Sequence, residues 1–126
     1  MDQQVSVEPG RWAAYRFETK RAGHIDITAS VIGTNGRTAS VFVCDKLSFH
    51  AFKSGRKSNC RGLFDRNGRL TFSYQAARSG SYFVVADNRG DRYSEKTFKI
   101  KVAVPAHFSQ KRVAGLRSTF QDLENF

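Results

Sequence analysis

The stretch that decides the fold runs Gly80-Ser81-Tyr82-Phe83-Val84-Val85-Ala86-Asp87-Asn88. In an extended segment alternate side chains point to opposite faces, so Tyr82, Val84 and Ala86 share one face. Phe83 and Val85 share the other, and both faces are apolar. This pattern is typical of a strand that is covered on both sides. We therefore expect it to be the most buried strand, with the others arranged around it.

Working outward, the chain alternates apolar and polar residues in short segments separated by Pro-Gly, Asn-Gly and similar turns. The clearest segment is 24–32, in which every second residue from Ile25 to Val31 is apolar. Further strands are predicted at 3–7 (at an edge), 11–19, 39–44 (a second central strand), 69–76 and 93–104. Seven or eight such strands predict an all-β fold, an antiparallel, jelly-roll-like β-sandwich.

Two segments break the alternation. Trp12 stands at the start of a strand on its polar side, and we expect it to cap the core rather than to serve as an exposed binding aromatic. In 45–52, the apolar residues Leu47, Phe49 and Phe52 recur at irregular spacing. A single helical turn or a tucked loop fits that spacing better than a strand does.

The end of the chain has a helical period. Its apolar positions are Val113, Leu116, Phe120 and Leu123. Spacings of three, four and three predict a C-terminal amphipathic helix over 109–125, about 25 Å long. The chain then divides into a sandwich domain, 1–106, and a helical tail, 107–126. The tail's apolar face needs a cover, either the sandwich or another chain.

The composition of these 126 residues suggests one domain with a net charge of +10. Such a balance favours anionic partners, namely nucleic acid, anionic glycans or membrane headgroups. No apolar run reaches the length of a transmembrane helix. Met1 is followed at once by polar residues, so an exported form would have lost its leader.

Two cysteines, Cys44 and Cys60, enclose a segment of ordinary disulfide-loop size. A bridge between them would contribute about 3 kcal/mol in the chain-entropy model. The alternative is two separate thiols, at least one of them buried beside Val43. A bridge would agree with an extracytoplasmic location, periplasmic or secreted.

Catalytic and metal-binding motifs are absent from the sequence. His24, His50 and His107 stand in no metal-ligand spacing, and no nucleophile motif occurs, so we predict no metal site, no cofactor and no enzyme activity. Oxygen ligands in the loop 87–91 are the kind that Ca²⁺ takes. Turn chemistry explains those residues more simply.

The largest charge feature is a basic segment that we define as the candidate anion-binding residues. They are Lys53, Arg56, Lys57, Arg61, Arg66 and Arg69. Phe52 and Phe64 are interleaved with them, and cations with stacking aromatics are typical of nucleic-acid binding. The competing interpretation is a solvated basic face with both Phe residues in the core.

A short adhesive motif occurs in a predicted hairpin loop. Arg89-Gly90-Asp91 spells the tripeptide that adhesive proteins present to integrins. A tripeptide also recurs by chance, so we treat the loop as a candidate only.

Several motifs resemble GOLD-like and bacterial pre-peptidase C-terminal (PPC-like) domains. They are Val7-Glu8-Pro9-Gly10 followed by Tyr15-x-Phe17, Val41-Phe42-Val43-Cys44-Asp45 leading to Phe49-x-x-Phe52-Lys53-Ser54-Gly55, and the closing 79–88 stretch. The resemblance covers residues 5–104 and implies a compact β-sandwich appended to another protein, active in secretion, cargo or ligand binding without chemistry of its own. The chain departs from it in the basic 53–69 segment and in the tail.

These observations predict a noncatalytic binding or accessory domain of an exported protein that interacts with a protein or a glycan. One alternative is a basic module that binds an anionic polymer, nucleic acid or acidic glycan. The other is the noncatalytic part of a larger secreted enzyme. Oligomerisation through the C-terminal helix is a further expectation.

Overall fold

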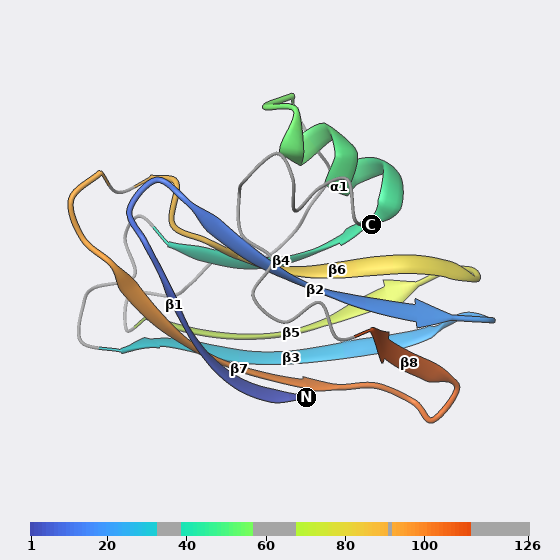
Figure 1. The fold of residues 1–126 in the computed structure, drawn as a ribbon. Coiled ribbons are helices and arrows are strands. Elements are labelled where there is room, and N and C mark those ends of the chain that lie inside the picture. Colours follow the sequence, from blue (N-terminus) through green and yellow to red (C-terminus); the bar gives the residue numbers. More distant parts are fainter. Residues whose placement is uncertain (33–38, 57–67, 91, 112–126) are drawn as a thin grey trace.

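The computed structural model describes residues 1–32, 39–56, 68–90 and 92–111, apart from the side chain of Lys111. In this part of the chain, strands and one helix form a β-sandwich (Figure 1). The elements are β1 (Asp2–Val7), β2 (Trp12–Thr19), β3 (Gly23–Ile32), β4 (Ser40–Asp45), α1 (Lys46–Lys53), β5 (Arg69–Ala76), β6 (Gly80–Asp87), β7 (Lys96–Ala103) and β8 (Phe108–Lys111).

The strands form two four-stranded sheets, which we call sheet A and sheet B. Sheet A has the order β1-β7-β3-β5, and sheet B has the order β4-β6-β2-β8. Neighbouring strands are antiparallel throughout. The predicted all-β antiparallel sandwich is confirmed, and so is the edge position of β1.

The main core lies between the two sheets. Strand β3 contributes Ile25 and Ile27, which are almost completely buried, while β7 contributes Phe98 and Ile100 from the neighbouring position in sheet A. The inner face of sheet B meets them with residues such as Val84 of β6. The apolar residues that alternate along the predicted strands are therefore the residues that form the core.

Strand β6 buries both of its faces. It lies between β4 and β2 and directs Tyr82, Val84 and Ala86 toward sheet A. Phe83 and Val85 point the other way, into a second cluster that α1 covers. The prediction of a central strand is confirmed, and the helix supplies the second cover.

Trp12 belongs to this second cluster. Its exposed fraction is 4%, and its ring meets Phe49 and Phe52 edge-on, with ring centroids 5.6 and 5.5 Å apart. Phe49 in turn stacks on Phe83 at 4.0 Å. The expectation that Trp12 is a cap is confirmed, although it caps the outer face of sheet B.

The prediction of a second central strand at 39–44 was wrong. Strand β4 lies at the edge of sheet B and pairs with β6 alone. Its two faces are apolar because the core covers one and α1 covers the other. The helix begins after Asp45, whose carboxylate accepts a hydrogen bond from the Ser48 amide at 2.7 Å. The predicted helical turn is thus a helix of eight residues.

The predicted helical tail was wrong for residues 109–111. They belong to β8, which pairs with β2 and places Thr19 opposite Phe108. Phe108 is anchored in the main core, so the chain continues as a strand along the edge of sheet B. The apolar period begins only at Val113, and that residue, Leu116, Phe120 and Leu123 lie outside the described residues.

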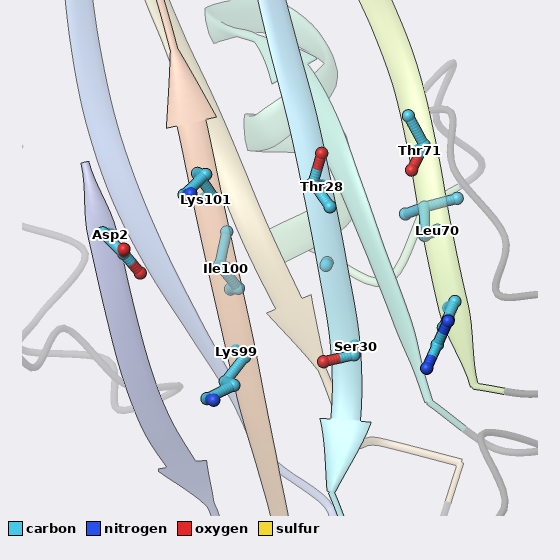
Figure 2. A pocket seen from close by; sticks show the side chains of 10 residues that line it. Asp2, Thr28, Ser30, Leu70, Thr71, Lys99, Ile100 and Lys101 are labelled. Atoms are coloured by element: carbon cyan, nitrogen blue, oxygen red, sulfur yellow. The ribbon is translucent and has the colours of Figure 1, made fainter.

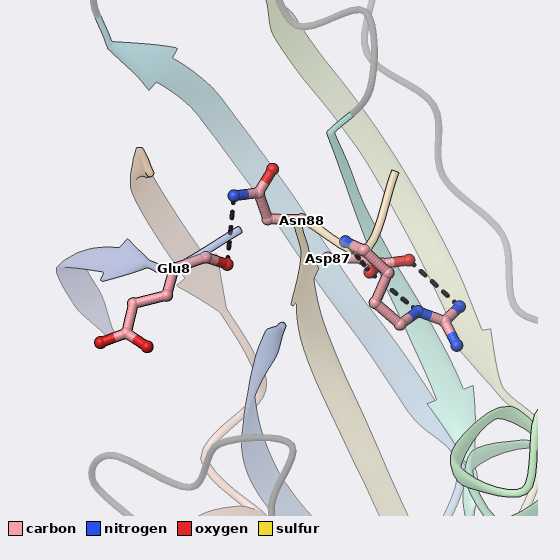
Figure 3. Close-up of polar contacts among 4 residues, drawn as sticks. Glu8, Asp87 and Asn88 are labelled. Atoms are coloured by element: carbon pink, nitrogen blue, oxygen red, sulfur yellow. Dashed lines mark hydrogen bonds and ion pairs between the residues drawn. The ribbon is translucent and has the colours of Figure 1, made fainter. Parts of the chain in front are cut away.

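Asn88, the residue after β6, connects the chain that follows β6 to the turn that follows β1. Its exposed fraction is 0%. Its amide nitrogen donates to the carbonyl oxygens of Val7 and Ser94 at 3.0 and 2.9 Å, and to that of Glu8 at 3.2 Å (Figure 3). Its amide oxygen accepts a hydrogen bond from the buried ammonium of Lys96 at 2.8 Å. The side chain therefore satisfies several backbone carbonyls that strand pairing leaves over.

Replacing Asn88 by Ala removes these hydrogen bonds from a buried site. We expect the free energy of unfolding to fall by more than about 2 kcal/mol, because buried carbonyls lose their donor. Urea denaturation measures the loss. Gln75→Ala, at an exposed position on β5, is the control and should change stability by less than about 0.5 kcal/mol. Equal losses in the two variants would contradict the role given to Asn88.

Replacing Phe49 by Ala opens a cavity between α1 and sheet B. We expect a loss of about 3 to 5 kcal/mol and a red shift of the Trp12 fluorescence as water reaches the indole. Leu47→Ala on the same helix is the matched control, since Leu47 is 81% exposed. A Phe49→Ala protein as stable as the Leu47→Ala protein would show that α1 does not support the fold.

Candidate functional site on the outer face of sheet A

An open groove of about 530 Å³ crosses the outer face of sheet A. It is lined by Asp2, Thr28, Ala29, Ser30, Arg69, Leu70, Thr71, Lys99, Ile100 and Lys101. The apolar members are buried and belong to the core, so they form the floor. The polar members stand on the surface above them (Figure 2).

Strand register arranges the polar side chains in rows. In one row, which we call the Arg69 row, Gln4 of β1 pairs with Lys99, Lys99 pairs with Ser30 of β3, and Ser30 pairs with Arg69 of β5. The next row runs in the same order through Asp2, Lys101, Thr28 and Thr71. On each strand these residues alternate with the residues that point into the core, so all of them lie on the outer face.

The spacing of the sheet brings three cations together. Lys99 and Lys101 are two residues apart on β7, so their Cα atoms are separated by roughly 6.7 Å. Arg69 is two strands away from Lys99, or roughly 9.5 Å. The described lining residues include three cations and one carboxylate, Asp2, which lies opposite Lys101. A positive surface with hydroxyl groups between the charges results.

The structure divides the candidate anion-binding residues. Arg69 lies on the outer face of sheet A, whereas Lys53 and Arg56 lie at the end of α1, which covers the outer face of sheet B. These described members do not share a face. Lys57, Arg61 and Arg66 lie outside the described residues.

The lysines of the groove were missed as site residues. Both lysines fall within the predicted strand 93–104, where they alternate with apolar residues. Their proximity to Arg69 depends on the order β7-β3-β5, which no local pattern announces. The one signal available in the sequence was that two lysines alternate on the polar side of a predicted strand.

Comparison with solved structures gives a clear likeness at this level of geometry. The chain resembles the pre-peptidase C-terminal domain of a collagenase from Bacillus anthracis, with a TM-score of 0.54, 16% identity, and coverage of 82% of this chain and 88% of that one. The fold is that of a PPC-like β-sandwich. No family model matches the sequence, and no curated protein does.

The α1 side of the PPC-like sandwich carries a second set of basic groups. The ammonium of Lys53 lies 5.2 Å from the centroid of the Phe49 ring, and partial burial lowers the pKa of Lys53. Partial burial, followed by the charges of Lys53 and Lys46, also lowers the pKa of His50. His50 therefore stays neutral at pH 7 and adds little to the charge of this side.

The candidate adhesive loop has a constrained arginine. The Arg89 guanidinium lies 3.9 Å above the Phe52 ring centroid and pairs with Asp87, whose oxygens it meets at 3.0 and 3.3 Å (Figure 3). An adhesive role would require Arg89 to leave both partners. Asp91, the last residue of the motif, lies outside the described residues, and Gly90 is exposed.

Residues 1–32, 39–56, 68–90 and 92–111 contain neither a cluster of metal ligands nor a membrane-spanning helix. No group of three or more His, Cys, Asp or Glu side chains there is arranged to hold a metal ion. The amide of Asn88, which the sequence offered as an oxygen ligand, is used in loop hydrogen bonds. No helix among those residues is long and apolar enough to cross a membrane.

Cys44 is buried in the second cluster, with an exposed fraction of 1%. Cys60 lies outside the described residues, so the bridge between them stays a prediction. We expect the intact mass of the nonreduced protein to be lower than that of the dithiol by two hydrogens. Reduction should lower the free energy of unfolding by about 3 kcal/mol. Alkylation of two thiols without reductant would refute the bridge and weaken an extracytoplasmic assignment.

Proposed function

We propose that this chain is a noncatalytic binding module of a larger exported protein and that it holds a glycan on the outer face of sheet A. The observation that carries the proposal is the groove, where cations and hydroxyls from separate strands converge on one surface. Its polar side chains stand on paired strands, so their backbone positions are set before a ligand arrives.

The chemistry of the lining favours a glycan over a protein. Protein interfaces centre on buried aromatic, Met or large apolar anchors. None of the lining residues in the described part of the chain is aromatic or Met, and the apolar ones are part of the core. Thr28, Ser30 and Thr71 instead offer hydroxyl groups, which can both donate and accept hydrogen bonds to sugar hydroxyls.

The lining also supports a role without catalysis. Hydrolysis of a glycosidic bond ordinarily uses a pair of carboxyl groups, one as acid and one as base or nucleophile. Among the described residues that line the groove, Asp2 is the one carboxylate. The solved domain with the similar fold is a C-terminal domain of a collagenase, which agrees with an accessory module attached to another part. The predicted Cys44–Cys60 bridge agrees with an extracytoplasmic location.

A second candidate is a module that binds nucleic acid. The net charge of +10 favours it, because phosphate neutralisation dominates such binding. The two candidates differ in what they require near the cations. Single-stranded nucleic acid binds with stacking aromatics, whereas the groove presents hydroxyls.

A charge placed in the middle of the groove tests the proposed function. Thr28→Glu should abolish binding to any polysaccharide that the unmodified protein retains in a panel of neutral and acidic chains. His50→Glu on α1, at an exposed position, is the matched control and should leave binding unchanged. The recovered polysaccharide should keep its original length.

Failure of this proposal has two forms. Either no polysaccharide in the panel is retained, or retention is unaffected by Thr28→Glu while both variants remain folded by circular dichroism. Shortened polysaccharide would overturn the noncatalytic role.

A further inference from the structure

We infer that the ligand of the outer face is an acidic polysaccharide whose sulfate or carboxylate groups are held by Lys99, Lys101 and Arg69. This inference rests on the proposed function and adds the ligand class, the residues and the direction of the ligand. It differs from the segment-based prediction, since two of its cations come from β7 and one from β5.

The sheet fixes the separations of the three charges. Strand β7 is an interior strand, paired with β1 on one side and β3 on the other. Lys99 and Lys101 are exposed on it, and Arg69 is exposed at the start of β5. The backbone positions that carry these three cationic side chains therefore cannot move independently. We expect such a site to recognise negative groups that repeat along a chain rather than a single ion.

The charges on the outer face of sheet A also favour one direction for a bound anionic chain. The Arg69 row contains Gln4, Lys99, Ser30 and Arg69, and no carboxylate. The neighbouring row places Asp2 beside Lys101, and the row beyond it contains Asp26 next to Ala103. These carboxylates repel an anionic chain that follows β7 toward Ala103. A polyanion is therefore best placed across the strands, along the Arg69 row, with Lys101 of the neighbouring row roughly 6.7 Å from Lys99 along β7.

The hydroxyl groups between the cations favour a glycan over nucleic acid as the ligand. Ser30 lies between Lys99 and Arg69, and Thr28 lies between Lys101 and Thr71. Cations alternating with hydroxyls complement a chain that alternates acidic groups with sugar hydroxyls. Bases would find no aromatic partner among the lining residues that the structure describes.

The test is the salt dependence of heparin binding, measured by calorimetry between about 50 and 200 mM salt. If three cations each contact one acidic group, log K should fall with log salt at a slope of about 2 to 3. This slope is well below the one expected if the whole net charge of +10 took part in binding. Lys99→Gln with Arg69→Gln should lower that slope by about 2 and weaken binding at low salt by about tenfold or more.

Two controls make the measurement specific to the groove. Lys46→Gln with Arg56→Gln removes the same charge from the α1 side and should leave the slope unchanged. Lys99→Arg keeps the charge and should keep the slope. Hyaluronan, which carries carboxylates without sulfate, shows which acidic group is preferred, and dextran is the neutral probe.

Each contrary outcome is informative. The inference falls if the α1-side double variant lowers the slope as much as the groove variant, or if dextran binds as tightly as heparin. It also falls if DNA of equal charge binds as well and loses affinity in the groove variant. Dextran binding that Thr28→Glu abolishes would overturn the acidic ligand but leave the proposed function standing. Absence of binding to every polysaccharide removes both.

Discussion

The burial of β6 on both faces is the constraint on which the other layers depend. A strand with Val84 on one side and Phe83 on the other needs an apolar cover in both directions. Sheet A covers one side, and α1 with Trp12 covers the other. Because each aromatic ring buries a large apolar area, removing either cover would expose much of what stabilises the fold.

This arrangement makes the two outer faces of the sandwich unequal. Helix α1 lies over part of the outer face of sheet B (Figure 1), and the residues beneath it are apolar. Sheet A instead presents Lys, Arg, Ser and Thr side chains on its outer face. The groove is therefore a consequence of the alternation that builds the core. Inward residues of β3 and β7 hold the sheets together, and their outward neighbours form the proposed binding surface.

The connections at one end rely on a buried polar group. Asn88 and Lys96 have exposed fractions of 0% and 2%, and their side chains hydrogen bond to each other at 2.8 Å. The sequence offered Asn88 as a turn residue or a metal ligand, and did not single out Lys96. Burial of both follows from the approach of the turn after β1 to the segment after β6, which brings carbonyl oxygens into reach of one amide.

Local patterns determined the elements of this protein. Period-two alternation predicted β3 and the inward faces of β5 and β7, and the doubly apolar stretch identified β6, because side-chain direction in a strand depends only on residue parity. The same pattern at 39–44 did not distinguish a central strand from an edge strand under a helix. The strand order decided that β4 is an edge, and α1 supplied the cover for its second apolar face.

Strand order was decided by the tertiary structure. Lys99 and Arg69 lie on either side of β3, because β3 pairs with both β5 and β7. It precedes both strands by many residues in the sequence. Likewise, Ser109 and its neighbours became strand β8 because the edge of β2 was open to them. Hydrogen bonds between strands distant in sequence set these relations, and such bonds form between backbone groups that every residue shares. The sequence alone could therefore determine which residues face outward, but not which of them become neighbours.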